Sequence, residues 1–238
     1  SHYYAEFLHQ RQETLQKRHD RHVVEEVERE IGNIHLAWDW AVAEARWARV
    51  ARSLEGLWFF FLIRGPFQVG EALFERAASR LRTWLREETQ AGQERRRLLA
   101  RLLVAQARFR NRLVLHDRAA ETSKTAVQLA RHVGDAGIEA AACVEWGESL
   151  WRQGTYEASR QKLEQALEKA RAADRPAIEA ESLRHIGNTY LMVGRFERAT
   201  SYYQQAAHLC HEIGDRMGEA AALDTNRRWT SIVRSAIS

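Results

Sequence analysis

The sequence predicts an all-α protein in which helical hairpins stack into a right-handed superhelical solenoid behind an N-terminal helical pair. Residues 146–159 and 186–199 share their landmark positions at an offset of 40 residues, and a fixed period of this size is typical of stacked two-helix units. The chain has only 2 prolines in 238 residues, which favours an almost wholly helical protein. Apolar residues also recur at helical spacing along most of the chain.

Glycine marks two positions of each repeat. Gly147 and Gly187 fall in the middle of the predicted first helix, where glycine costs about 1 kcal/mol relative to alanine, so we expect a neighbouring helix to approach closely there. Gly154 and Gly194 fall where that helix ends, the usual place of a left-handed cap residue. Small residues that permit close antiparallel packing follow in the second helix: Ser159, Ala166, Ala199 and Ala206.

These landmarks resemble the tetratricopeptide repeat in its longer variant. The resemblance implies repeats over about residues 47–85, 98–132, 137–172 and 177–212 and an incomplete unit over 217–238, whose missing partner helix would leave an open C-terminal end. The polar stretch 86–97 separates the first two units, and we expect an extended loop there. Residues 229–237 still place apolar side chains at helical spacing, which predicts a final helix.

Residues 1–46 do not follow the repeat and predict a helical pair. One helix falls within residues 2–19, and Asp20 is a suitable N-cap for a second helix that runs to about Ala45. The motifs His2-Tyr3-Tyr4 and Glu30-x-x-Asn33-Ile34-x-x-Ala37-x-x-Trp40-Ala41 resemble the entry to the sensor region of STAND-type signalling ATPases. That resemblance implies a nucleotide-binding and winged-helix module before Ser1, in a bacterial signalling ATPase or transcriptional regulator.

The composition disfavours several classes of function. The formal net charge is +4, and 32 of the 36 basic residues are arginine, but 32 acidic residues are interspersed with them, which favours solvated helix faces over a nucleic-acid surface. The most apolar stretch, Leu57 to Ile63, is far too short to cross a bilayer. Cys143 and Cys210 occupy unrelated repeat positions and are expected to be buried free thiols, which is typical of a reduced, cytoplasmic protein.

Motifs for catalysis or cofactor binding do not occur in the sequence. It contains no Gly-x-x-x-x-Gly-Lys-Ser/Thr phosphate loop, no His-Glu-x-x-His and no paired-cysteine metal spacing. The nearest cluster, at residues 208–212, is better explained as helix surface than as a metal site. We therefore expect no catalytic residue, no metal and no cofactor.

The remaining candidate is the concave face, which the first helix of each hairpin lines in tetratricopeptide stacks. Arginine forks match carboxylates, so this face would suit an extended acidic segment. Trp151 falls on the groove side, whereas Trp38, Trp40, Trp58 and Trp146 fall at packing positions and are expected in the core. The predicted concave-face residues are Arg101, Arg108, Arg112, Glu148, Trp151, Arg152, Arg184, Asn188 and Leu191.

The sequence therefore predicts a non-catalytic sensor or regulatory domain that binds a protein or peptide partner, an acidic one in particular, or a small-molecule inducer. The alternatives are a constitutive interaction scaffold, or self-association through the open C-terminal end. Nucleic-acid binding is disfavoured, and a steep salt dependence of DNA binding would reverse that view. On this reading, Arg108→Glu or Trp151→Ala weakens ligand binding without unfolding the domain.

Overall fold

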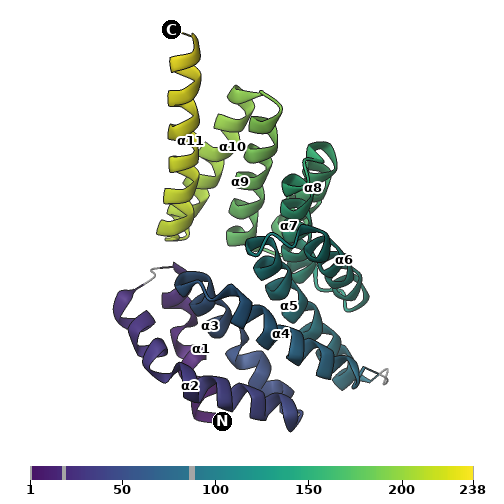
Figure 1. The fold of residues 1–238 in the computed structure, drawn as a ribbon. Coiled ribbons are helices and arrows are strands. Elements are labelled where there is room, and N and C mark those ends of the chain that lie inside the picture. The colour runs from purple at the N-terminus through teal and green to yellow at the C-terminus, as the bar shows by residue number, and fades with distance from the viewer. Residues whose placement is uncertain (1, 18–19, 86–88, 238) are drawn as a thin grey trace.

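A computed structural model describes residues 2–17, 20–85 and 89–237, and this part of the chain contains eleven helices and no strand. The helices follow one another in a curved stack from the N-terminal to the C-terminal end (Figure 1). The fold class that the sequence predicts, an all-α repeat solenoid, is confirmed. The helices are α1 (His2–Lys17), α2 (Arg21–Ala43), α3 (Trp47–Arg64), α4 (Phe67–Arg82), α5 (Gln90–Arg112), α6 (His116–His132), α7 (Ala136–Arg152), α8 (Tyr156–Ala172), α9 (Pro176–Met192), α10 (Phe196–Glu212) and α11 (Arg216–Ile237).

The odd-numbered helices form one continuous row. Each of them contacts the next odd-numbered helix, from α1 and α3 through to α9 and α11, while the even-numbered helices pack mainly against their sequence neighbours. In a curved stack the more closely spaced row lies on the inner side, so the odd row lines the concave face. The helical hairpins α5–α6, α7–α8 and α9–α10 supply three successive helices of this row.

The glycine landmarks have the predicted roles. Gly154 and Gly194 are left-handed, with φ values of 79° and 74°, and each follows the end of an odd-numbered helix. The following N–H then reaches back into the helix, as from Thr155 to the carbonyl of Leu150 at 3.0 Å, which satisfies a helix-end carbonyl. A Cβ on Gly187 would lie 2.7 Å from Cε1 of Tyr203, so this mid-helix glycine makes room for a neighbouring aromatic ring.

One repeat earlier, a valine occupies the cap position. Val114 has a φ of 63°, and its side chain is 72% exposed. A β-branched residue is strained in this region by about 1–2 kcal/mol and here gains little from packing. We expect Val114→Gly to raise the free energy of unfolding by about 1 kcal/mol, after allowance for the greater entropy of glycine in the unfolded chain. Urea denaturation would measure the gain. The control is Val193→Gly, at a C-cap with a negative φ of −99°, and this change is expected to destabilise the protein.

The main hydrophobic core runs from α1 to α8 and has a ring cluster at its centre. Phe61, Phe74 and Phe109 are at most 1% exposed. Trp38 is buried, as predicted, and Trp58 and Trp146 pack against the core while half-buried. The prediction for Trp40 is wrong: it is 44% exposed, because it lies on the outer face of α2, where the Arg49 guanidinium sits 5.4 Å from its ring centroid.

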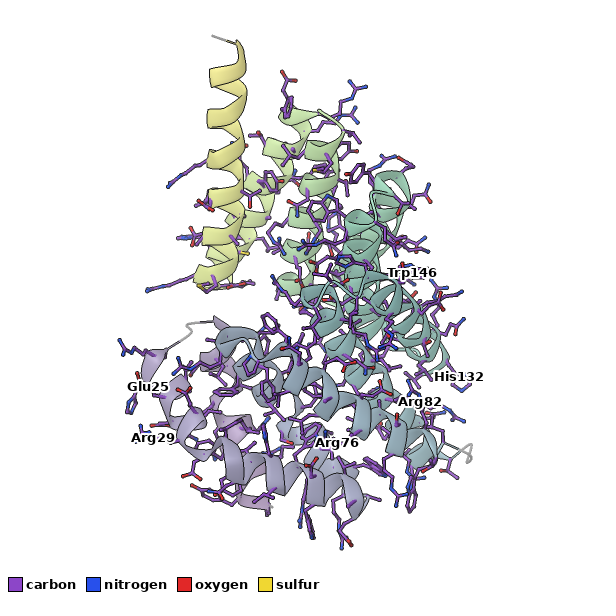
Figure 2. The ribbon with its side chains drawn as sticks, in the orientation of Figure 1. Glu25, Arg29, Arg76, Arg82, His132 and Trp146 are labelled. Carbon is purple, nitrogen blue, oxygen red and sulfur yellow. The ribbon has the colours of Figure 1, made fainter. Side chains whose placement is uncertain are left out.

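The two cysteines are buried and unpaired, as expected. Burial raises the pKa of the Cys143 thiol to about 11 and that of the Cys210 thiol to about 12, so both behave as small apolar core residues. Charged side chains such as Arg29, Arg82 and His132 project outward from the ribbon (Figure 2).

The prediction of an extended loop over residues 86–97 is wrong for most of that stretch. Residues 86–88 lie outside the described part, but α5 already begins at Gln90. The Thr89 side chain caps this helix by accepting a hydrogen bond from the N–H of Gly92 at 3.1 Å. Ion pairs then hold the polar first turns, since Arg97 donates to Glu94 at 2.5 Å and to Asp135 at 3.1 Å. The extra residues therefore lengthen a helix.

The N-terminal pair is helical, and Asp20 caps its second helix as predicted, accepting from the N–H of His22 at 2.9 Å. The structure brings the His2-Tyr3-Tyr4 motif of α1 into contact with the motif on α2 that begins at Glu30. The Tyr4 hydroxyl and the Asn33 amide both donate to the same oxygen of Glu30, at 2.9 and 3.0 Å. The predicted final helix is present as α11, while the side chains of residues 229–237 lie outside the described set.

Candidate functional site

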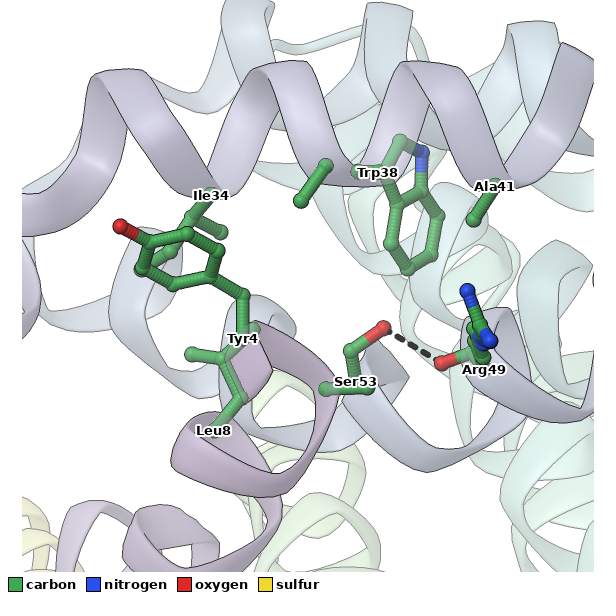
Figure 3. Close-up of a pocket in the computed structure, with 9 residues that line it drawn as sticks. Tyr4, Leu8, Ile34, Trp38, Ala41, Arg49 and Ser53 are labelled. Atoms are coloured by element: carbon green, nitrogen blue, oxygen red, sulfur yellow. Dashed lines mark hydrogen bonds between the residues drawn. The ribbon is translucent and has the colours of Figure 1, made fainter. Parts of the chain in front are cut away.

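A small cavity between α1, α2 and α3 is the first hollow to consider. Tyr4, Trp38 and Ser53 face it, and the Ser53 hydroxyl donates to the Arg49 carbonyl at 2.8 Å (Figure 3). Its volume is about 10 Å³, close to that of one water molecule. This space is therefore a packing defect of the helical pair and too small for an organic ligand.

The middle of the odd row holds a buried ion-pair triad. Arg108 on α5 donates through Nε to Glu145 on α7 and through Nη2 to Glu181 on α9, the latter at 2.7 Å. The Arg108 side chain is 14% exposed, Glu145 is fully buried, and Glu181 is 25% exposed. One guanidinium thus ties together three successive helices of the concave row. Each carboxylate accepts from a different N–H of the planar guanidinium, and hydrogen bonds between ionised partners are stronger than those between neutral ones.

The pKa values of the two triad carboxylates shift in opposite directions because different charges surround them. Burial raises the pKa of Glu145 to about 7, against the attraction of Arg108. Burial also acts on Glu181, but the positive charges of Arg108 and Arg184 outweigh it and lower the pKa of this more exposed carboxyl. Burial alone would lower the pKa of Arg108, yet the two carboxylates raise it, so the guanidinium stays charged.

Polar side chains extend the triad in both directions. Asn111 donates to the Glu145 side chain at 3.3 Å and to its carbonyl at 3.1 Å, and accepts from the Ser149 hydroxyl at 2.9 Å. On the other side, the Arg108 guanidinium lies 5.0 Å from the ring centroid of Trp58 on α3. The network therefore crosses four helices of the odd row.

The α9 end of the network contains a buried histidine. His185 is 5% exposed, and its Nε2 lies 2.8 Å from Nη2 of Arg184. Burial first, and then the Arg184 charge, hold its pKa well below the ordinary value, so the ring is neutral. Nearby, the side-chain oxygen of Asn188 accepts a hydrogen bond from the Tyr203 hydroxyl at 2.8 Å.

Several residues of the predicted concave face are buried or already paired, so they offer little surface to a partner. Glu148 is 7% exposed and pairs with Arg152 at 3.3 Å, and Leu191 is 9% exposed in a packed cluster with Ile186 and Tyr203. With Arg108 they fill the space between converging helices, because the odd row is closely spaced on its inner side. Arg101 is engaged too, donating to Glu55 at 3.0 Å and to the Ala51 carbonyl.

The more accessible members lie at the C-terminal ends of the odd helices. Arg112 ends α5 and is exposed, and no acidic partner within ion-pair distance is found for it in the described ranges. Arg152 ends α7, is 40% exposed, and lies 5.0 Å from the ring centroid of its neighbour Trp151. Trp151 is half-buried, and its indole N–H has no hydrogen-bond partner among the described residues.

The predicted concave face did not include four members of the network, Glu145, Glu181, Asn111 and Trp58, of which Trp58 was expected in the core. Their repeat equivalents carry other chemistry: Ala105 and His185 occupy the register of Glu145, and Ala141 and Arg101 that of Glu181. Periodicity therefore gave no signal for them. Within the described ranges, no group of three or more His, Cys, Asp or Glu side chains is placed to hold a metal ion. In that part of the chain, too, every helix lacks the length or the apolarity needed to cross a membrane.

With this geometry in place, the class of protein is a helical-repeat solenoid built around a concave row of helices. Residues 137–210, which cover nearly all of the α7–α8 and α9–α10 hairpins, match the tetratricopeptide repeat family. No match is found among curated protein sequences.

Solved structures share the fold. BtubC (BKLC) from P. vanneervenii superposes with a TM-score of 0.55 at 18% identity, covering 84% of this chain and 91% of that protein. A Rap protein complexed with Competence and Sporulation Factor gives a TM-score of 0.54 at 13% identity, covering 94% of this chain and 69% of that one. At these identities the likeness shows a common fold alone.

Proposed function

We propose that the C-terminal ends of the odd helices bind an extended acidic segment of a protein partner. The observation that carries this proposal is the succession of Arg112 and Arg152 one repeat apart, with Trp151 beside them. Successive arginines spaced by the stack suit successive carboxylates of an extended chain, and a partly exposed aromatic is a typical anchor. On α9, the half-buried Arg184 and Asn188 would continue this surface.

The buried network supports this surface without itself recognising the partner. Arg108, Glu145 and Glu181 fix the relative positions of α5, α7 and α9, so the exposed groups at their ends are held at defined spacing. A preorganised surface loses less side-chain entropy on binding. The tetratricopeptide match over residues 137–210 supports the same assignment, because such repeats commonly bind proteins and peptides through this face.

We further propose that the chain is the sensor arm of a STAND-type signalling ATPase or transcriptional regulator, held in a reducing cytoplasm. The Tyr4–Glu30–Asn33 contacts support this, since they join the two motifs that carry the resemblance. Leu36 and Trp40 lie one turn apart on α2 and are 72% and 44% exposed, an apolar strip that a preceding module would cover. A partner or inducer would act by binding one of two conformations more tightly than the other.

The binding proposal is tested with a library of acidic peptides and fluorescence anisotropy. Arg112→Glu combined with Arg152→Glu is expected to weaken the best peptide by at least about ten-fold, because two attractive contacts become repulsive. Because Arg152→Glu also removes the ion-pair partner of Glu148, the unfolding midpoint should fall slightly, and binding is measured well below the onset of unfolding. The matched control reverses two exposed arginines on even helices, Arg29→Glu with Arg118→Glu, and should bind like the wild type.

Two results would overturn the proposal. If the Arg112/Arg152 variant binds like the wild type, the concave surface is not the recognition site. If no peptide binds and the chain instead dimerises with rising concentration, self-association or a constitutive scaffold explains it better. The sensor-arm assignment stands or falls separately: a native gene without a phosphate-binding loop and a winged helix before the codon for Ser1 would rule it out.

A further inference from the structure

A second hollow lies away from the ion-pair network, where the α9–α10 turn meets the start of α8. Its volume is about 400 Å³, within the range of ligand pockets. Its walls come from three helix segments: the first turn of α8, the last turn of α9 and the first turn of α10. The principal lining residues are Tyr156, Arg160, Tyr190, Val193, Arg195 and Arg198.

The pocket carries an excess of positive charge. Three arginines line it against a single carboxylate, that of Glu157. Arg160 is committed, since it donates to both oxygens of Glu157 at 2.6 Å and to the Tyr190 hydroxyl at 3.3 Å. Arg195 and Arg198 are exposed, and in the described ranges neither has a carboxylate within ion-pair distance. Neither guanidinium group is neutralised by a carboxylate of the described part, so both can bind an anion.

Aromatic and apolar groups complete the wall. The Tyr190 ring is already flanked, since it stacks on Tyr202 with a centroid distance of 5.4 Å and has the guanidinium groups of Arg160 and Arg198 within 5.7 Å of its centroid. Tyr156, which is half-buried, leaves a ring available to a ligand. Val193 is 53% exposed and adds apolar surface at the rim. A ligand with a planar ring beside its anionic group would use both parts of the site.

The repeat shows that this chemistry is particular to one junction. At the junction before it, the positions of Arg160, Arg195 and Arg198 hold Ala120, Thr155 and Ala158. Tyr190 and Val193 correspond there to Leu150 and Gln153. The helical fold is the same at both places, so stacking does not require the arginines or the tyrosine. Their function lies outside the packing of the repeat.

We propose that this pocket binds an aromatic phosphate monoester. A phosphate monoester carries close to two negative charges at neutral pH and three acceptor oxygens. It matches the formal excess of two positive charges that three arginines leave over Glu157. Arg195 and Arg198 would hold the phosphate, and Tyr156 would stack on the ring. The ligand can be a free small molecule or a phosphorylated tyrosine side chain of another protein.

Isothermal titration calorimetry with phenyl phosphate tests the proposal directly. We expect phenyl phosphate to bind more tightly than either inorganic phosphate or phenol, because it alone has both groups. The variant Arg195→Thr with Arg198→Ala reproduces the residues of the preceding junction, so the fold should tolerate it, and it should weaken phenyl phosphate by at least about ten-fold. Tyr156→Leu should weaken phenyl phosphate and leave the weak binding of inorganic phosphate unchanged.

Further measurements distinguish the two possible sources of the ligand and state which results would overturn the proposal. A phosphotyrosine tripeptide that binds more tightly than phenyl phosphate identifies the ligand as part of a protein chain, and weaker binding identifies a free small molecule; both agree with the proposal. Equal affinity of the wild type for inorganic phosphate and phenyl phosphate would overturn it, as would a double variant within two-fold of the wild type. Arg112→Glu with Arg152→Glu should leave phenyl phosphate binding unchanged, so this site and the concave surface fail independently.

Discussion

Replacing Arg108 by alanine is expected to lower the free energy of unfolding by about 3–5 kcal/mol, the usual cost of removing one partner from a buried ion pair. The physical reason is that Glu145, which is fully buried, loses the cation that compensates its charge. Chemical denaturation at neutral pH would measure the loss. A protein of ordinary stability, about 5–15 kcal/mol, would then retain little of it.

The pH dependence of this loss has a definite sign. In the wild type, burial already raises the pKa of Glu145 to about 7, above its unfolded value, and without Arg108 the folded pKa rises further. Below pH 7 the Glu145 carboxyl is protonated in both folded proteins, so the stability deficit of Arg108→Ala relative to the wild type should grow as pH rises above about 7. Adding Glu145→Gln removes the buried charge and should recover part of the stability.

The matched control is Arg112→Ala, one turn further along α5 with an exposed side chain, where we expect a change within about 0.5 kcal/mol. An Arg108→Ala variant as stable as the Arg112→Ala control would show that the triad does not hold the odd row together. The sequence-based expectation that Arg108→Glu spares the fold is replaced by the opposite one, because a third carboxylate would face Glu145 and Glu181.

Truncating Phe109 to alanine is the second large effect, with an expected loss of about 3–5 kcal/mol. The Phe109 side chain has no exposed area, and its ring centroid lies 5.6 Å from that of Phe74 and 6.3 Å from those of Phe61 and Phe67. Its loss removes apolar burial and leaves a cavity where α3, α4 and α5 meet. Urea denaturation of the purified chain would measure it.

A double-mutant cycle with Gly70 sharpens this test. A Cβ on Gly70 would lie 2.9 Å from the Phe109 ring, so Gly70→Ala should destabilise the wild type. In the Phe109→Ala background that clash is absent, and the same change should be neutral or stabilising. Additive effects would show that the ring and the glycine are not in contact. Phe196→Ala, at a 42% exposed position, is the control and should cost far less.

The sequence by itself determined the repeat, the helix ends and most of the core. Gly154 and Gly194 predict left-handed caps because a backbone conformation with positive φ favours a residue without Cβ. Gly147 and Gly187 predict a close packing site because a mid-helix glycine recurs at the repeat offset. Such features are local or periodic, so a single chain displays them. The prediction that Trp40 is buried was wrong because helical spacing places a residue on one face of its helix but does not show whether another helix covers that face.

Only the tertiary structure decided which side chains meet across several helices. Arg108 and Glu181 are separated by 73 residues and occupy different repeat registers, so neither spacing nor composition pairs them. A Cβ on Gly56 would lie 2.5 Å from the Leu8 carbonyl oxygen, a crossing of α1 and α3 outside the repeat register. The repeat fixes the backbone because each hairpin must bury the same apolar face against the next. Charge pairing and the shape of a pocket depend on the variable residues between, and on the distances that stacking sets among them.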